Sequence, residues 1–158
     1  MADAPLKTTT MHLTVVTPEA TVLDLPVEFV TVPLYDGEIG IGRDHAPMIG
    51  RLGFGQLRYR TAGTSVRYYV DGGFVQVDNN RVSVLTNRAL PTSEIDHETA
   101  REQLATALKR TTSNAEELAI RDRLILQARA QLRIANQVIP PGSYASSQGG
   151  PPGGMANV

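Results

Sequence analysis

Apolar and polar residues alternate along the first half of the chain, and this period of two limits its fold more than any other feature. Leu13 and Val15 alternate with His12 and Thr14. Successive side chains of a β-strand point to opposite faces, so such segments form strands with one buried and one wet side. By the same rule, segment 64–71 has two sets of residues, one facing the core (Val66, Tyr68, Val70) and one facing water (Arg67, Tyr69, Asp71).

Turn-forming residues divide the alternating region into short pieces. Asp36-Gly37 and Ala62-Gly63 are examples, because Gly, Asn and Asp favour tight turns. Short strands at fairly regular spacing are typical of an all-β sandwich or flattened barrel. We expect strands at residues 11–16, 20–23, 27–33, 38–41, 48–51, 54–61, 64–71, 73–78 and 81–86.

After Pro91 the pattern changes to that of helices. Apolar residues recur at helical spacing over residues 96–109 and again over 115–137. Ser113 and Glu116 have the spacing of a capping box at the start of the second helix. The short loop between the helices predicts an antiparallel α-helical hairpin.

These patterns divide the chain into four parts. We expect a flexible N-terminus at 1–10, a β-sandwich domain at 11–90, a helix-loop-helix domain at 91–139 and a disordered Pro/Gly-rich tail at 140–158. Residues 1–10 lack the apolar core of a secretory signal, and every apolar run is far shorter than a membrane-spanning helix.

Charge and cysteine content exclude several kinds of function. The formal net charge of -1 provides no overall field for binding nucleic acid or an anionic membrane. The chain has no cysteine, which excludes disulfides, thiol catalysis and cysteine-ligated metal sites.

Two segments of the β region could carry chemistry. The glycines of residues 37–42 do not have the spacing of a phosphate-binding loop, so we interpret them as bends in a strand. His45 follows Asp44 and could act as a general base, although a hydrogen-bonded loop histidine is the simpler interpretation.

The second helix carries four arginines that could bind a phosphate or an acidic partner surface. They are Arg121, Arg123, Arg129 and Arg133. The alternative is a solvated helix face on which Glu117 and Arg121 form an ion pair one turn apart. The residues alone therefore predict a binding or structural module.

Several motifs, in order, resemble the epsilon chain family of bacterial F-type ATP synthases. Residues 37–48, GEIGIGRDHAPM, match the family's G-E-x-G-I…H-A-P segment. Val16-Thr17-Pro18-Glu19 precedes it, and Asp71-Gly72-Gly73-Phe74, the segment 80–85 and the segment 130–134 follow it. The resemblance covers about residues 11–138.

The resemblance implies a non-catalytic subunit of the central rotor. Its partners would be the gamma subunit and the c-ring, with Glu38, Gly40 and His45 in one loop region that faces the membrane. The hairpin would lie folded on the sandwich, or extend and restrain ATP hydrolysis by presenting Arg121, Arg123, Arg129 and Arg133 to the alpha and beta subunits. In the folded form, Leu104, Leu108, Ile125 and Leu132 would be buried against the sandwich. As a peripheral part of the complex, the chain would lie on the cytoplasmic side of the cell (inner) membrane.

Some members of the family bind ATP through an I/L-D-x-x-R-A motif. Here the segment is Ile95-Asp96-His97-Glu98-Thr99-Ala100. Thr99 therefore stands where the motif has its arginine, three positions after Asp96. We therefore expect no bound cofactor.

Two other classes of function remain open from the sequence. One is a free-standing β-sandwich that binds a ligand and dimerises through its hairpin, and the other is an enzyme that depends on His45.

Overall fold

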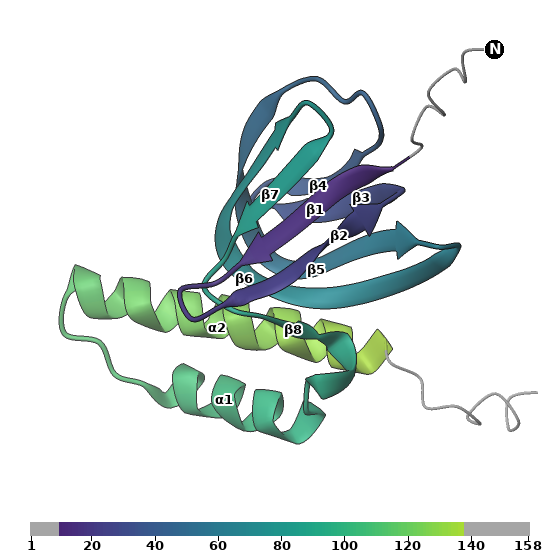
Figure 1. Cartoon of the computed structure of the whole chain (residues 1–158). Coiled ribbons are helices and arrows are strands. Elements are labelled where there is room, and N and C mark those ends of the chain that lie inside the picture. The colour runs from purple at the N-terminus through teal and green to yellow at the C-terminus, as the bar shows by residue number, and fades with distance from the viewer. Residues whose placement is uncertain (1–9, 138–158) are drawn as a thin grey trace, which may run out of the picture.

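The computed structural model describes residues 10–137, in which a β-sandwich rests on a pair of helices (Figure 1). The strands are β1 Met11–Val16, β2 Thr21–Val27, β3 Phe29–Leu34, β4 Gly37–Ile41, β5 Met48–Thr61, β6 Thr64–Asp78, β7 Arg81–Leu85 and β8 Ala89–Pro91. A 3-10 turn at Thr92–Glu94 leads to helices α1 His97–Lys109 and α2 Ala115–Gln137. The predicted tail, 140–158, and most of the predicted flexible N-terminus lie outside the described residues.

The strands form one sheet in the order β2-β1-β7-β6-β5-β3-β4, which folds over on itself to make the two layers. Strands β5 and β6 are long and pair along their whole length. The prediction that each consists of two strands is wrong, since both continue through the bend. Strand β8, which the sequence analysis missed, pairs with β6.

Glycines permit the bend of β5 and β6. Gly53 would place a Cβ atom 3.0 Å from the Leu34 carbonyl oxygen, and Gly72 has a φ of +68°. Gly73 has a φ of +106°, and a Cβ there would lie 1.8 Å from the carbonyl oxygen of Leu85. The Gly73 position is closed to any residue with a Cβ atom, and the positive φ of Gly72 favours glycine. These glycines let a strand turn sharply while its hydrogen-bond ladder continues.

The sandwich core contains the residues that the alternation predicts, but two residues expected to face water are also buried. Leu13, Val15 and Leu57 are buried between the layers. The prediction that Tyr69 and Asp71 face water is wrong, because both are buried. Helix α2 covers this outer part of β6 and gives the strand two buried faces.

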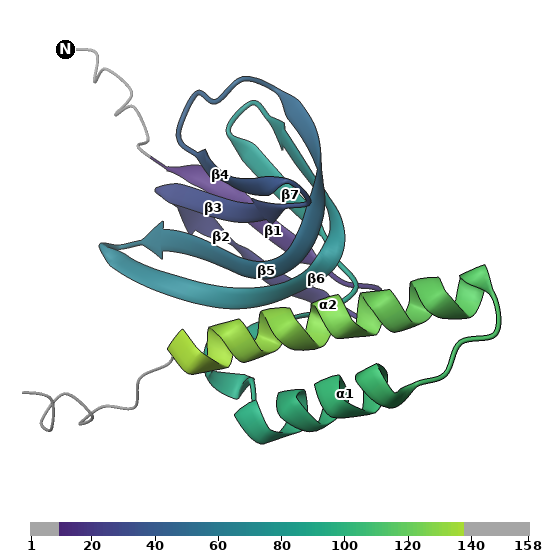
Figure 2. The ribbon, with the colours of Figure 1, turned by 180° about the vertical axis from the view of Figure 1, so that it is seen from behind.

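The two helices run antiparallel, as predicted, and α2 lies between α1 and the sheet (Figure 2). Ala130 and Ile134 of α2 pack on Tyr69 of β6. The expectation that Leu108 is buried is wrong, because its side chain is 46% exposed on α1. The hairpin is therefore docked on the sandwich by the later part of α2.

Helix α2 spans the predicted residues, 115–137, but its capping pair lies one residue later than the predicted capping box. The Asn114 side chain accepts a hydrogen bond from the Glu117 amide at 2.9 Å, and Glu117 accepts one from the Ser113 amide at 2.7 Å. The capping pair is thus Asn114 and Glu117, not Ser113 and Glu116. This bond also directs the Glu117 carboxylate toward the Ser113 amide and not toward the predicted partner Arg121.

Replacing Asn114 by alanine removes the acceptor for the free amide of Glu117. We expect this change to lower the stability of the hairpin by about 1 kcal/mol, the usual value of such a cap. Hydrogen exchange of the amides in the first turn of α2 should become faster by the factor to which this free energy corresponds. Ser113→Ala is the control and should change little, since only the main chain of Ser113 takes part.

Candidate functional site

Glu38 lies on β4, the edge strand of the sheet, where it is exposed. Its carboxylate accepts a hydrogen bond from Arg58 Nη2 of β5 at 3.1 Å. Strand β4 pairs only with β3, so its other edge is free of sheet partners within the described residues. The position offers a carboxylate beside an unpaired strand edge.

Gly40 lies on the same strand, beneath an aromatic ring. A Cβ atom at Gly40 would meet the Phe29 ring at 2.7 Å, and one at Gly42 would meet the same ring at 3.6 Å. Phe29 itself is 45% exposed. Gly40 therefore makes room for Phe29 and lies in the strand predicted at 38–41, whereas His45 lies in the connection that follows this strand.

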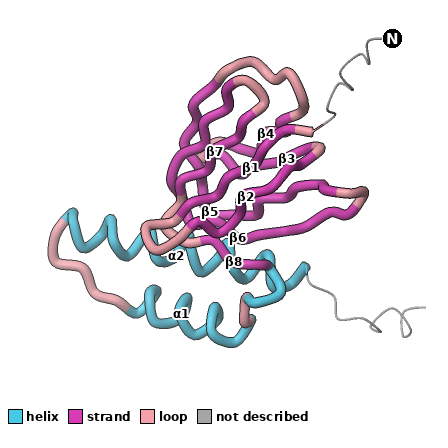
Figure 3. The backbone as a smooth tube through the Cα atoms, viewed as in Figure 1, coloured by secondary structure: helices cyan, strands magenta, loops and turns pink. Residues whose placement is uncertain are grey.

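His45 lies in the connection between β4 and β5, at the end of the sandwich away from the helices (Figure 3). This connection is held to the β6–β7 turn, because the Asp44 amide donates to Asn80 Oδ1 at 2.7 Å and Asn80 Nδ2 donates to the Asp44 carboxylate at 3.2 Å. Asp44 and Asn80 both have a φ of 59°. The His45 ring nitrogen Nδ1 bonds the carbonyl of Ala46 at 2.7 Å. Its partner is thus a carbonyl and not the carboxylate of Asp44, which an enzyme using this pair would require.

Asp96 caps helix α1. Its carboxylate accepts hydrogen bonds from the amides of Glu98 and Thr99, each at 3.3 Å, and from the Thr99 hydroxyl at 2.6 Å. The Thr99 hydroxyl bond is the main reason that the pKa of Asp96 lies below its ordinary value. Asp96 and Thr99, the two residues of the altered ATP motif, therefore bind each other. Thr99 also helps to line a pocket of about 700 Å³ between the helices, and Asp96 does not.

The four arginines of α2 differ in their surroundings. Arg123, Arg129 and Arg133 are exposed, whereas Arg121 is half-buried and its Nε atom has no hydrogen-bond partner. Arg123 and Arg133 line a groove of about 1620 Å³ between α2 and the sheet, and Arg129 does not. The structure thus brings two of the four predicted residues to one surface.

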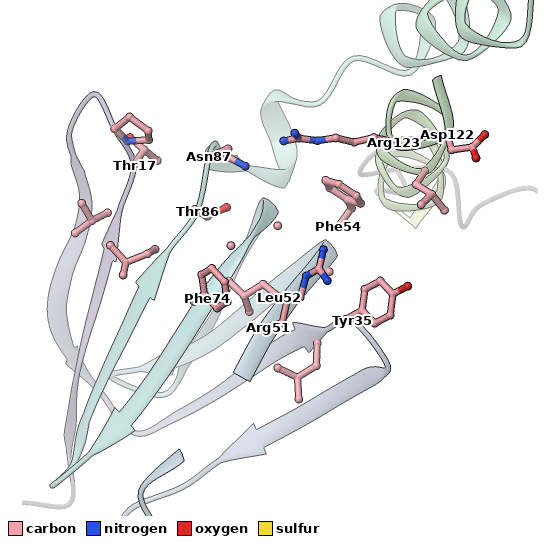
Figure 4. A pocket seen from close by; sticks show the side chains of 18 of the residues that line it. Thr17, Tyr35, Arg51, Leu52, Phe54, Phe74, Thr86, Asn87, Asp122 and Arg123 are labelled. Carbon is pink, nitrogen blue, oxygen red and sulfur yellow. The ribbon is translucent and has the colours of Figure 1, made fainter. Parts of the chain in front are cut away.

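The groove combines aromatic and basic side chains (Figure 4). Phe54 and Phe74 come from the sheet, and Arg123 reaches from α2 toward the segment that holds Asn87. On the opposite side, the Arg51 guanidinium lies 5.1 Å from the centre of the Tyr35 ring. Such a surface suits a partner with apolar and acidic groups.

A buried polar cluster joins the sheet to α2, and the sequence analysis did not find it. Gln127 Nε2 of α2 donates to the Asp71 carboxylate at 2.7 Å. The Tyr69 hydroxyl donates to the other oxygen of Asp71 at 3.5 Å, and the buried side chain of Gln131 lies close to this hydroxyl. Asp71 and Gln131 are 5% and 7% exposed, so these bonds lie away from water.

Burial governs the ionisation of this cluster. Loss of hydration raises the pKa of the Asp71 carboxyl, while the charge of Arg123, the Tyr69 hydroxyl, the charge of Arg88 and the Gln127 amide oppose the rise. Burial likewise raises the pKa of Tyr69, which stays protonated and able to donate. One sequence signal could have indicated the polar cluster. Tyr69 and Asp71 are two positions apart in β6, and Gln127 and Gln131 are four positions apart, about one helical turn, in α2.

Two kinds of feature are absent from the described residues. Residues 10–137 contain no cluster of three metal-ligating side chains. Neither α1 nor α2 has the length and apolar character that crossing a bilayer requires.

Comparison with known proteins relates this architecture to one family. The family described as "ATP synthase, Delta/Epsilon chain, beta-sandwich domain" matches residues 10–92. An ATP synthase epsilon chain of Rhodopirellula baltica is 49% identical over 121 residues, which cover 77% of this chain and 94% of that protein. A sodium ion specific ATP synthase epsilon chain of Propionigenium modestum is 31% identical over 130 residues, or 81% and 95% of the two chains.

A solved structure has the same fold. A chain of the mitochondrial ATP synthase of Euglena gracilis, in an assembly of OSCP, F1 and c-ring, has a TM-score of 0.71 and 24% identity, over 85% of this chain and 84% of that one. The family match spans the sandwich, and the Rhodopirellula baltica protein matches along nearly its whole length. On these grounds, the chain belongs to the ATP synthase epsilon chain family.

Proposed function

We propose that this chain is a central-stalk subunit of an F-type ATP synthase and couples ion flow through the c-ring to ATP synthesis. The observation that carries the proposal is the match to an ATP synthase epsilon chain over 94% of that protein. The subunit acts by binding its neighbours, the gamma subunit and the c-ring at the sandwich and the alpha and beta subunits at the hairpin. The complex holds it at the cytoplasmic face of the membrane.

The sandwich supplies the contacts of the rotor foot in this proposal. Glu38 presents a carboxylate on the free edge of β4, and polar or cationic groups of the c-ring loops would be suitable partners. His45 adds a polar ring on a connection that Asp44 and Asn80 hold in place. Gly40 contributes indirectly, because it lets Phe29 pack against β4.

The hairpin has a regulatory role in this proposal. Docked on the sheet, it leaves the catalytic subunits free to hydrolyse ATP. Released, it extends and presents Arg121, Arg123, Arg129 and Arg133 to acidic surfaces of the alpha and beta subunits. The small apolar contact of Ala130 and Ile134 with Tyr69 supports a two-state element, since a modest free-energy gap is one that partner contacts can reverse.

A charge reversal at Glu38 tests the rotor assignment. In Glu38→Lys the new ammonium lies beside Arg58, where a carboxylate now accepts a hydrogen bond. We expect the fold to remain, because exposed ion pairs contribute at most about 1 kcal/mol. Attachment to the c-ring should weaken, and proton- or sodium-driven ATP synthesis by membranes that carry the variant should fall.

Glu19→Lys is the matched control, since Glu19 is exposed in the β1–β2 turn. Both variants, tagged at the C-terminus, are recovered from gently solubilised membranes, and the proteins that come with them are identified by mass spectrometry. The unmodified chain and Glu19→Lys should bring alpha, beta, gamma and c subunits. Recovery of the unmodified chain alone or as a homodimer would contradict the proposed function, and normal coupling in Glu38→Lys would remove Glu38 from the contact.

A further inference from the structure

The contact between α2 and the sheet contains a carboxylate that a purely apolar contact would not need. Asp71 lies on β6 at the bend, next to Gly72, with its side chain directed at α2. The main chain of Asp71 is bonded separately, because its amide donates to Thr86 Oγ1 at 3.0 Å and to the Arg88 carbonyl at 3.1 Å. The carboxylate is therefore not required for the strand itself.

Every side-chain partner of Asp71 that comes from α2 is lost when α2 leaves the sheet. Gln127 donates to one carboxylate oxygen at 2.7 Å, and Gln131 of α2 lies close to the Tyr69 hydroxyl that bonds the other oxygen. A buried polar group that loses its partner carries its full desolvation penalty, whereas one that returns to water does not. The cluster therefore favours two outcomes, complete docking with all bonds made or complete release into water.

We propose that Asp71 and Gln127 form a polar latch that sets how readily the hairpin leaves the sandwich. The inference rests on the proposed regulatory role of the hairpin, because it names the contact that controls its release. The latch gives α2 one register on the sheet, since Gln127 must lie opposite Asp71. It also limits the strength of docking, because a carboxylate must be removed from water to form it.

Protonation should shift the latch in a defined direction. The titratable and charged groups that face Asp71 are Tyr69 on β6, Arg88 before β8 and Arg123 on α2. Burial raises the pKa of Asp71 above its ordinary value of 3.8 in the docked form, and release to water returns it toward that value. The docked form thus binds a proton on Asp71 more tightly than the released form does. Docking is therefore strongest below pH 3.8 and weakens as the pH rises through the raised pKa of the docked form.

A unique thiol can measure docking even when release is rare. The chain has no cysteine, so Ala130→Cys places one small thiol under α2, at a position that is 1% exposed. A dithiodipyridine reacts with it only when α2 lifts, and the labelling rate follows the released fraction. Ala105→Cys, exposed on α1, gives the intrinsic rate at each pH. Val82→Cys, fully buried in the sandwich, reports global unfolding.

In the full chain at neutral pH, Asp71→Ala should accelerate labelling of the thiol at position 130 about tenfold, equal to about 1.4 kcal/mol. Gln127→Ala should have a similar effect without touching the sheet, and the double variant should add little to either. Asp78→Ala, an exposed carboxylate on the same strand, and Gln137→Ala, an exposed amide on the same helix, should change nothing. Asp71→Asn should remove the pH dependence.

Five outcomes decide the proposal. Non-additive acceleration at position 130, with no change at position 82, supports the latch. Unchanged labelling in Gln127→Ala, or equal acceleration at both positions, overturns it. Independent, additive effects of Asp71→Ala and Gln127→Ala overturn it as well. Faster release without any change in ATP hydrolysis by the assembled complex supports the latch and contradicts the inhibitory role of the hairpin.

Discussion

Replacing Gly73 by alanine is expected to prevent formation of the sandwich. The new Cβ atom would lie 1.8 Å from the Leu85 carbonyl oxygen, 2.8 Å from its carbon and 2.9 Å from the Cα of Thr86. All three are backbone atoms, so no side chain can rotate to make room. Strands β6 and β7 would have to separate at a point where Phe74 pairs with Leu85. We expect a loss of at least about 4 kcal/mol, which is exceptional for one methyl group.

Chemical denaturation followed by circular dichroism measures this loss. Gly63→Ala is the matched control, because Gly63 also has a positive φ, +74°, but has no atom within 4 Å of the added Cβ. It should lose only the backbone strain, about 1 to 2 kcal/mol. A Gly73→Ala chain as stable as the Gly63→Ala chain would show that the bend is not fixed by this contact.

Replacing Ala130 by tryptophan is expected to release the hairpin and leave the sandwich folded. Ala130 is 1% exposed and packs with Ile134 against Tyr69, so an indole ring cannot enter without moving α2. Overpacking of this kind costs about 3 kcal/mol, which shifts the docking equilibrium roughly a hundredfold. The isolated chain should become longer by small-angle scattering. In the assembled complex, ATP hydrolysis should fall, because more hairpins extend.

The control is Ala105→Trp, at an exposed position on α1, which adds the same ring without touching the sheet. This control should leave ATP hydrolysis unchanged. Its scattering profile should differ only by the contribution of the added ring. Strand core residues such as Leu57 should keep their protection from hydrogen exchange in both variants, since they lie on the other side of β5 and β6. An extended Ala130→Trp chain whose complex hydrolyses ATP at the normal rate would contradict the inhibitory role.

The sequence predicted the architecture because local patterns reflect it. Alternation in segments such as 11–16 follows directly from one buried face, and the helical repeat after Pro91 indicates the hairpin. Strand ends were less predictable near Gly53 and Gly73, where glycine can end a strand or bend it. In the structure the strands bend at these glycines and do not end, because the hydrogen-bond ladder between β5 and β6 continues on both sides of them.

The polar cluster at α2 could not be predicted from local pattern alone. Asp71 and Gln127 are 56 positions apart, and only tertiary packing brings them together. Asp71 also occupies a strand position that alternation assigns to water, so its burial becomes visible only when α2 covers the strand. In the same way, the Asn114 cap was misplaced by one residue because Ser113 and Asn114 are both good capping residues.

The continuity of β5 and β6 has a mechanical consequence. Both strands run through the two layers and pair with each other throughout, so the layers cannot slide past one another without stretching hydrogen bonds along that ladder. A load applied at the β4 edge passes through β3 and β5 to the layer on which α2 rests. A stalk foot built in this way is stiff in shear, and the elastic twist of a rotor would be stored in its longer parts.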